Sequence, residues 1–259
     1  MPEALITDPV FYAVAIPAVL LVGVSKGGFG GGVALLGVPM LALSIPLVQA
    51  AAILLPILCL MDLFALRAYR GQYSAENLRV LVPAALLGIA AAGLAFGALS
   101  EAFIRGLVGG IAVAFAARYG IGVLRADGAD APATPASPLR GLFWGASTGF
   151  ASTIAHAGGP PLAVYMLPQR LTPTHYVGTT VILFTVVNYV KLVPYCLLGQ
   201  LHGGNLATSL VLAPLAPLGI ALGRWLHDRV SERVFYHVSY AMLMIVGAKL
   251  LFDAWPGIA

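Results

Sequence analysis

A chain of 259 residues that is 60% hydrophobic and only 9% charged cannot bury its apolar side chains in one soluble core, because a soluble domain is usually about 25% charged. The chain therefore requires lipid as a solvent. Its net charge of +4 does not indicate a nucleic-acid partner, because the arginines stand in short loops between apolar segments, where the positive-inside rule places them.

Two long apolar stretches, 11–43 and 139–169, are each interrupted by a cluster of glycine, serine and proline, at 23–32 and at 151–161. The pieces on either side are short for a full crossing. We therefore predict that each stretch is a broken-helix hairpin with its tip inside the membrane, either re-entrant or a pair of short helices. Six other stretches have about the 20 residues that a spanning helix needs, and they are 47–66, 79–98, 102–124, 175–198, 205–226 and 233–252.

The two halves of the chain match each other in order, which indicates a gene duplication. Ser25 aligns with Ser152 and Gly31 with Gly158, and after a gap Pro83 aligns with Pro214. The first predicted repeat, 1–124, holds hairpin 11–43 and the spans 47–66, 79–98 and 102–124. The second, 139–259, holds hairpin 139–169 and the spans 175–198, 205–226 and 233–252. A polar linker rich in proline and alanine, 125–138, is predicted to connect them on the cytoplasmic side.

Arginine-bearing loops predict which side of the membrane each connection faces. Loops 99–101 and 199–204 contain no lysine or arginine and are placed outside, with both termini. Equivalent loops of the two halves then face opposite sides, so we predict an all-α polytopic membrane protein of two inverted repeats, each a broken-helix hairpin plus three transmembrane helices. The arginines that mark the cytoplasmic side are Arg67, Arg70, Arg79, Arg118, Arg125, Arg140, Arg224, Arg229 and Arg233.

Three short motifs resemble those of a known family. They are Gly23-x-x-Lys26-Gly27-Gly28-x-Gly30-Gly31-Gly32, Gly158-Gly159-Pro160 and Gly71-Gln72. With the duplicated layout, they make the chain similar, over essentially its whole length, to the sulfite exporter TauE/SafE family, also called the toluene-sulfonate uptake permease family. The resemblance implies a multi-pass transporter of the bacterial inner membrane. Its expected substrate is a small anion: sulfite, an organosulfonate such as sulfoacetate, or a related organic anion.

The first tip is predicted to bind the anion. Lys26 supplies a positive charge, and glycines let backbone N–H groups approach a ligand closely. A helix that begins after the tip would direct its positive dipole end at the anion. Alternatively, Lys26 reaches to a surface and the glycines only permit close helix packing. The predicted substrate-binding residues of this tip are Ser25, Lys26, Gly27, Gly28, Gly30 and Gly31.

The second tip is predicted to bind the same anion from the opposite side. His156 can donate to an oxyanion, can titrate near neutral pH and couple transport to protons, or can be a hydrogen-bonded structural residue. The hydroxyls of Ser25 and Ser152 can donate to anion oxygens or bond their own helix backbone. Pro160 suits the first turn of a helix. The predicted substrate-binding residues of this tip are Ser152, Thr153, His156, Gly158 and Gly159.

Asp62, Asn188 and Lys191 are predicted to serve in coupling or to line the pathway. Lys26, Asp62 and Lys191 lie far from the predicted loops. A charge inside the membrane costs free energy, so each of them indicates a pairing or a function. Asp62 and Lys191 stand at roughly corresponding places in the two halves, so they can form an ion pair, or Asp62 can carry a proton. The predicted function is secondary transport by alternating access around a midplane site, with a proton, a sodium ion or no ion coupled.

Three other functions are weaker. An anion channel would use the same tips as a filter, and a passive structural membrane protein would bind no ligand. An intramembrane serine hydrolase is suggested by Gly145-x-Ser147-x-Gly149, but that pattern needs a strand before the serine, and this segment is one apolar helix. The histidines lack metal-ligand spacing and the glycine-rich stretch lacks the G-K-[ST] ending of a phosphate loop. We therefore predict no metal and no cofactor; the oligomeric state stays open.

Overall fold

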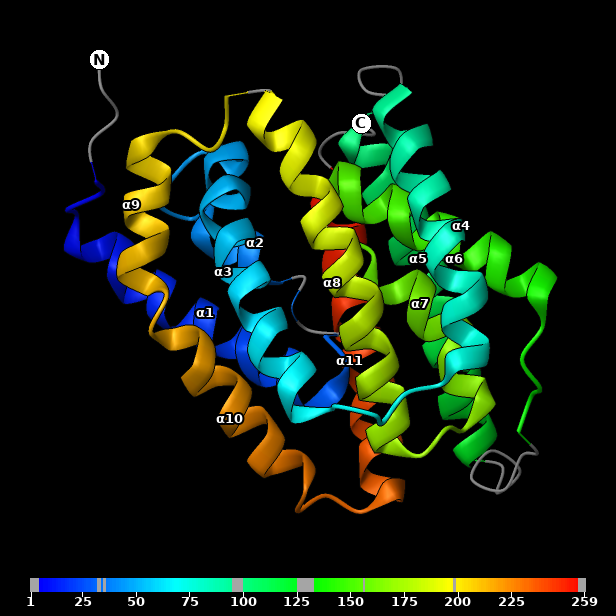
Figure 1. The fold of residues 1–259 in the computed structure, drawn as a ribbon. Helices are drawn as coiled ribbons and strands as arrows, with labels where there is room; N and C mark the ends of the chain where they lie inside the picture. The colour runs from blue at the N-terminus through cyan, green and yellow to red at the C-terminus, as the bar shows by residue number, and fades with distance from the viewer. Residues whose placement is uncertain are drawn as a thin grey trace. The chain divides into compact units, whose positions relative to one another are not determined.

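The computed structural model describes residues 5–31, 34, 36–94, 100–124, 133–155, 157–197 and 199–255. Within these residues every regular element is a helix (Figure 1). The helices are α1 (Pro9–Phe29), α2 (Gly37–Leu41), α3 (Leu47–Ala68), α4 (Ala75–Leu94), α5 (Glu101–Leu124), α6 (Pro138–Ala155), α7 (Gly159–Met166), the 3-10 helix η2 (Leu167–Gln169), α8 (Pro173–Leu197), α9 (Gly203–Leu212), α10 (Leu215–His227) and α11 (Glu232–Ala254).

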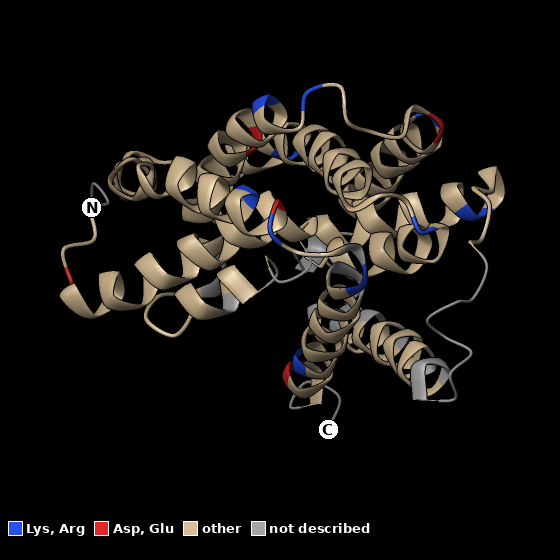
Figure 2. Cartoon of the chain, turned by 90° about the horizontal axis from the view of Figure 1, so that it is seen from below, with Lys and Arg blue, Asp and Glu red and all other residues tan. Residues whose placement is uncertain are grey.

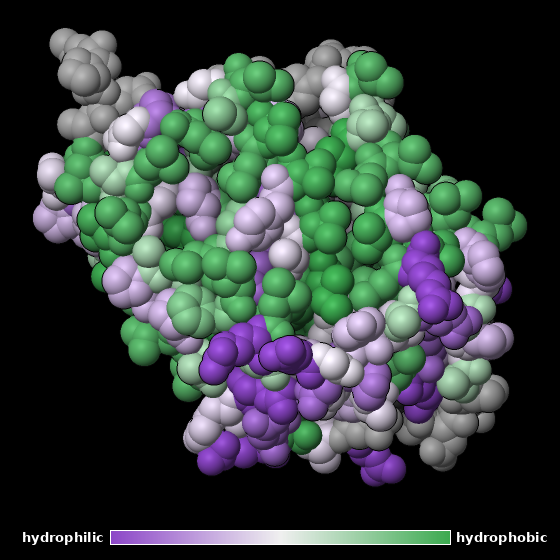
Figure 3. Space-filling view, in the orientation of Figure 1, coloured by the Kyte–Doolittle hydropathy of each residue, from purple (hydrophilic) through white to green (hydrophobic). Residues whose placement is uncertain are grey.

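In the described part of the chain, five helices are long and apolar enough to cross a bilayer, or six if the bent pair α9–α10 counts as one span. Large apolar side chains stay exposed on them: Leu94 is 91% exposed and Leu197 is 82% exposed. Most helical turns carry no charged residue (Figure 2), and hydrophobic residues dominate the face seen in Figure 3. Such a surface is suited to lipid, in which each helix satisfies its own backbone hydrogen bonds.

The first hairpin differs from the prediction. Helix α1 is one continuous helix of 21 residues that runs through the glycine-rich motif, so its arm is not short, and the predicted break at 23–32 begins only after Phe29. The helix ends because Gly30 and Gly31 have φ angles of 68° and 80°, which favour glycine and terminate helices. At its other end, Asp8 caps the helix by accepting a hydrogen bond from Val10 N.

The predicted span 205–226 is a bent pair of helices that together are long and apolar enough to cross a bilayer. Helices α9 and α10 are bent by 42° at a short break. Pro214 and Pro217 have no N–H to donate, so the carbonyls of Leu210 and Ala213 lose their helical partners. Ala213 N instead donates to Leu210 O at 3.2 Å, a tighter turn.

The second hairpin has its break where the sequence places one. Helix α6 ends at Ala155 and α7 begins at Gly159. The predicted linker 125–138 lies partly outside the described residues, and its last residue belongs to a helix, because α6 begins at Pro138. The remaining predicted spans lie on α3, α4, α5, α8 and α11, with residues 95–98 of the span 79–98 outside the described part.

The helices form two compact units that each take residues from both sequence halves. Unit 1 contains Met1–Tyr73 and Val177–Arg229, and unit 2 contains Ser74–Tyr176 and Val230–Ala259. In unit 1, α1 packs most extensively on α10; in unit 2, α4 packs on α6 and α5 on α11. Figure 1 shows α1 (blue) running beside α10 (orange).

Glycines make these helix pairs unusually close. In unit 1, a Cβ added at Gly23 would lie 2.7 Å from Gly219 Cα, and one at Gly28 would lie 2.6 Å from Gly223 O. In unit 2, a Cβ at Gly149 would lie 2.0 Å from Ala85 O. Small residues of this kind let membrane helices approach until their backbones touch. Glycine is therefore required at these positions for packing.

Helix α4 offers a matched test of this packing. A Cβ added at Gly88 would lie 2.0 Å from Ala146 O, whereas a Cβ at Gly93 meets no atom within 4 Å. We expect Gly88→Ala to push α6 away and lower the apparent Tm of the purified protein. The atoms that the new Cβ meets are backbone atoms of α6, which cannot rotate away as a side chain can. Gly93→Ala is expected to be neutral, or to stabilise the helix by about 0.5–1 kcal/mol through backbone entropy. Equal Tm values for the two variants would contradict the close α4–α6 contact.

Candidate functional site

An ion pair is buried inside unit 1, between α1 and α3. Lys26 Nζ lies 2.5 Å from Asp62 Oδ1, and the two side chains are 5% and 0% exposed. Asp62 therefore forms an ion pair with Lys26, a partner that reasoning from sequence did not consider for it. The alternative in which Lys26 reaches to a surface is wrong, since its ammonium ends on a fully buried carboxylate.

Helix α8 contributes two further polar side chains to this place. Asn188 Nδ2 donates to Asp62 Oδ2 at 2.8 Å, so both carboxylate oxygens accept a hydrogen bond. Lys191 follows three residues later, nearly one helical turn. Its side chain is 1% exposed, and its charge interacts with those of Lys26 and Asp62. We call Lys26, Asp62, Asn188 and Lys191 the charged cluster.

The charged cluster contains two lysines and one aspartate, all of them buried. Asp62 is the buried acidic residue among the described residues, and Lys26 and Lys191 are the buried lysines. The surrounding residues of α3, such as Leu58, Cys59 and Met61, are buried and nearly all apolar. Charges interact strongly where the effective dielectric constant is low, so the Lys26–Asp62 pair is held more firmly here than it would be at a surface.

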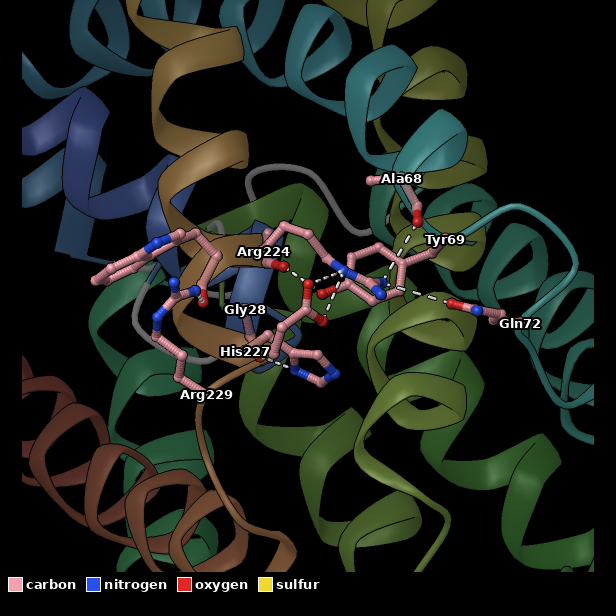
Figure 4. A network of polar contacts seen from close by, with 10 residues as sticks. Gly28, Ala68, Tyr69, Gln72, Arg224, His227 and Arg229 are labelled. Carbon is pink, nitrogen blue, oxygen red and sulfur yellow. Dashed lines mark hydrogen bonds and ion pairs between the residues drawn. The ribbon is translucent and has the colours of Figure 1, made fainter.

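The end of α1 is held by side chains from α3 and α10. The Tyr69 hydroxyl donates to Gly27 O, and His227 Nδ1 donates to Gly28 O at 2.9 Å (Figure 4). These carbonyls belong to the last turn, where a helix leaves such groups without helical partners. Because a carbonyl can only accept, Nδ1 of His227 must carry a proton. Burial raises the pKa of the Tyr69 phenol, which keeps it a donor.

Arg224 of α10 fixes Tyr69 in turn. Its guanidinium lies 4.6 Å from the centroid of the Tyr69 ring, its Nη1 donates to Ala68 O at 3.4 Å, and its Nε lies 3.0 Å from Asp228 Oδ1. Figure 4 shows Arg224 beside Tyr69 and Ala68 at the end of α3. We call Tyr69, Arg224 and His227 the clamp. The clamp binds the carbonyls of the two residues that follow Lys26, and it therefore fixes the position of the Lys26 backbone.

The clamp was missed by reasoning from sequence. In the sequence, Arg224 marks only a cytoplasmic loop, and the histidines, including His227, have no metal-ligand spacing. The one signal was the Gly71-Gln72 motif, which directly follows the end of α3. Gln72 Oε1 lies 3.5 Å from Arg224 Nη1, so that motif marks the neighbourhood of the clamp.

The glycines of the first motif divide by position. Gly27 and Gly28 pack against Ile220 and Gly223 of α10, whereas Gly30 and Gly31 end the helix. Lys26 thus stands in the last turn of α1, where the helix dipole is negative and favours a cation. The expectation that a helix beginning after the tip aims its positive end at an anion is wrong for this motif, because α2 begins only at Gly37 and is five residues long.

The second motif lies in unit 2 and follows the prediction more closely. Pro160 stands in the first turn of α7, after Gly158 at the N-cap, as its missing N–H allows. Ser152 is buried in the last turn of α6, and the Thr153 hydroxyl donates to Gly149 O at 2.9 Å. His156 lies outside the described residues. Of the hydrolase pattern, the Ser147 hydroxyl donates to Phe143 O of its own helix at 2.8 Å.

The clamp yields a test with a matched control. Tyr69→Phe removes the donor to Gly27 O and leaves a buried carbonyl without a partner, which costs about 1–3 kcal/mol. Tyr73 is exposed and just beyond the same helix, so Tyr73→Phe is expected to leave stability unchanged. Thermal denaturation of both purified variants measures the difference, and a Tyr69→Phe protein as stable as Tyr73→Phe would show that the clamp does not hold α1.

Comparison with protein families places this geometry in a known group. The model of the sulfite exporter TauE/SafE family matches residues 15–250, which include the charged cluster, the clamp and both glycine-rich motifs. Searches among curated proteins and among solved structures find no match. Members of the family are membrane transporters and not enzymes. With a match over most of its length, this multi-pass membrane protein belongs to the sulfite exporter TauE/SafE family.

Proposed function

We propose that this chain is a secondary transporter that moves a small anion of the sulfite or sulfonate type across the membrane by alternating access. The observation that carries the proposal is the charged cluster, a buried group of two lysines and one aspartate inside apolar helices of unit 1. A charged residue at the centre of a membrane helix costs about 2.5–3.5 kcal/mol on insertion scales. Three charged residues in one apolar interior lower the stability of the fold, so we infer a functional role for them.

The charged cluster supplies the groups that an oxyanion needs. Lys26 and Lys191 carry hydrogen-bond donors with full positive charge, and such charge-assisted bonds are about twice as strong as neutral ones. Asn188 has a second amide N–H besides the one that it donates to Asp62. Asp62 holds Lys26 and Asn188 in place through its two oxygens. We assign substrate contact to Lys26, Asn188 and Lys191, and a positioning role to Asp62.

The second motif is proposed to contact the same anion at another stage of transport, as one of two inverted repeats. Its support is that both motifs end in the same way: Gly31 N donates to Ser25 O at 2.9 Å, and Ala157 N donates to Ala151 O at 3.0 Å. These bonds span six residues and terminate helices. Ser152, His156, Gly158 and Gly159 remain the proposed contacts from this side. Energy would come from an ion gradient, with His156 or Asp62 as the proton carrier if a proton is coupled.

Flux into liposomes tests the transporter proposal. We expect saturable uptake of one or more of sulfite, sulfoacetate, acetate and sulfate, with turnover far below that of a channel. Currents on the channel scale would replace the carrier with a channel. Complete absence of flux for all four anions, from protein that stays folded in the liposomes, would contradict the proposal.

Removal of one lysine tests the site itself. Lys26→Met removes a positively charged hydrogen-bond donor from the charged cluster, so we expect anion affinity to fall about tenfold or more, the factor that corresponds to 1.4 kcal/mol. Lys249→Met is the control, because Lys249 is partly exposed and paired with Asp253 on the last turns of α11. Affinity is measured by anion-dependent thermal stabilisation of each variant. Equal affinities for the two variants would remove Lys26 from the site.

A further inference from the structure

We infer that the outward side of α10 binds one anionic phospholipid, with the headgroup phosphate at Arg229 and the acyl chains along the leucines that precede it. The inference concerns a second site and goes beyond transport, because it uses no side chain of the charged cluster or of the clamp. Its basis is a line of exposed side chains on α10 that is apolar along its length and ends in a tryptophan and an arginine.

One side of α10 is packed and the opposite side is open. Gly219 and Gly223 lie against the backbone of α1, so α1 covers the packed side. Leu218, Leu222 and Trp225 are each more than half exposed, and their spacings of four and three residues place them together on the other side of the helix. In a membrane protein, lipid is the solvent for such an apolar surface.

Arg229 continues this line at its polar end. It stands two residues after the end of α10, and its backbone N donates to Leu226 O at 3.1 Å, so the helical turn extends to it. From Leu218 to Arg229 the helix rises about 16 Å. This length is close to half of a hydrocarbon core that is about 30 Å thick. A headgroup at Arg229 therefore places the acyl chains of one leaflet along the leucines.

Two contacts orient the Arg229 guanidinium at the surface. Its Cζ lies 4.0 Å from the centroid of the Trp225 ring, and its Nη1 donates to Trp225 O at 3.1 Å. A guanidinium has five N–H donors, so others remain for the oxygens of a phosphate, which arginine binds through two parallel hydrogen bonds. Figure 4 shows Arg229 apart from Tyr69, on the other side of His227.

The charge of Arg229 decides which phospholipid is preferred. The nearby Arg224 is paired with Asp228 at 3.0 Å, whereas Arg229 forms no ion pair with a carboxylate among the side chains that the structure describes. An arginine at the membrane surface attracts lipids with net negative charge. It gains less from phosphatidylcholine, because the choline group offsets the charge of the phosphate. The preferred lipid is therefore anionic, such as phosphatidylglycerol.

Trp225 can report its own lipid neighbours. The chain has three tryptophans, so Trp144→Phe and Trp255→Phe together leave Trp225 as the single fluorophore. This full-length protein is placed in phosphatidylcholine vesicles that contain a fraction of brominated phosphatidylglycerol or, in parallel, the same fraction of brominated phosphatidylcholine. Bromine on an acyl chain quenches only a tryptophan close to it. We expect phosphatidylglycerol to be preferred about fivefold beside Trp225, the factor that one arginine supplies near a lipid surface.

Two substitutions in this protein test the role of Arg229. Arg229→Gln is expected to abolish the preference. Arg140→Gln is the control, because it removes an exposed arginine of unit 2 and lowers the net charge equally, and it is expected to keep the preference.

Three results would overturn the inference. The first is equal quenching by the two brominated lipids before either arginine is changed. The second is a preference that Arg229→Gln leaves unchanged, or that both substitutions lower equally. The third separates a lipid from a free phosphate: if glycerol phosphate abolishes the extra quenching by brominated phosphatidylglycerol at the same ionic strength, the site binds a soluble phosphate. We expect glycerol phosphate to have no effect, because it lacks the acyl chains that contact the leucines.

Discussion

The interaction on which this site depends is the ion pair between Lys26 and Asp62, completed by Asn188. A buried charge without a partner is expensive, and breaking a buried pair costs about 3–5 kcal/mol. The pair therefore ties the end of α1 to the middle of α3 and, through Asn188, to α8. These helices are far apart in the sequence. They meet here because the apolar interior of unit 1 offers their charged side chains no solvent, so each charge is stabilised by the other.

The clamp explains why the lysine of the pair can be placed accurately. A helix end is normally its most mobile part, since its last carbonyls lack helical partners. Here Tyr69 and His227 donate hydrogen bonds to two of those carbonyls. Gly28 lets α1 approach the backbone of α10 closely. The glycine-lysine motif thus combines two requirements: small residues for contact between backbones, and one cation at the end of the helix, where the dipole also favours it.

Sequence alone predicts the helical class, most helix positions and the location of three charged residues far from the loops. The length of an apolar stretch and the presence of a charge within it can both be seen directly in the sequence. It fails where tertiary contact decides. Helix α1 continues through Gly23, Gly27 and Gly28, against their low helix propensity, because α10 packs on them. The bend between α9 and α10 was foreseeable at Pro214, although Pro83 and Pro194 lie inside helices without ending them. The partners of Asp62 depend on which helices pack together, and the spacing of residues along the sequence does not show this.

The packing inside each unit joins helices that come from different halves of the chain. Unit 1 joins α1 with α10, and unit 2 joins α6 with α4. Each unit therefore combines the first helix of one half with a later helix of the other. The glycine contacts in both pairs leave no space for helices to slide. Each unit is therefore held together by contacts between helix backbones, which no change of side-chain rotamer can relieve.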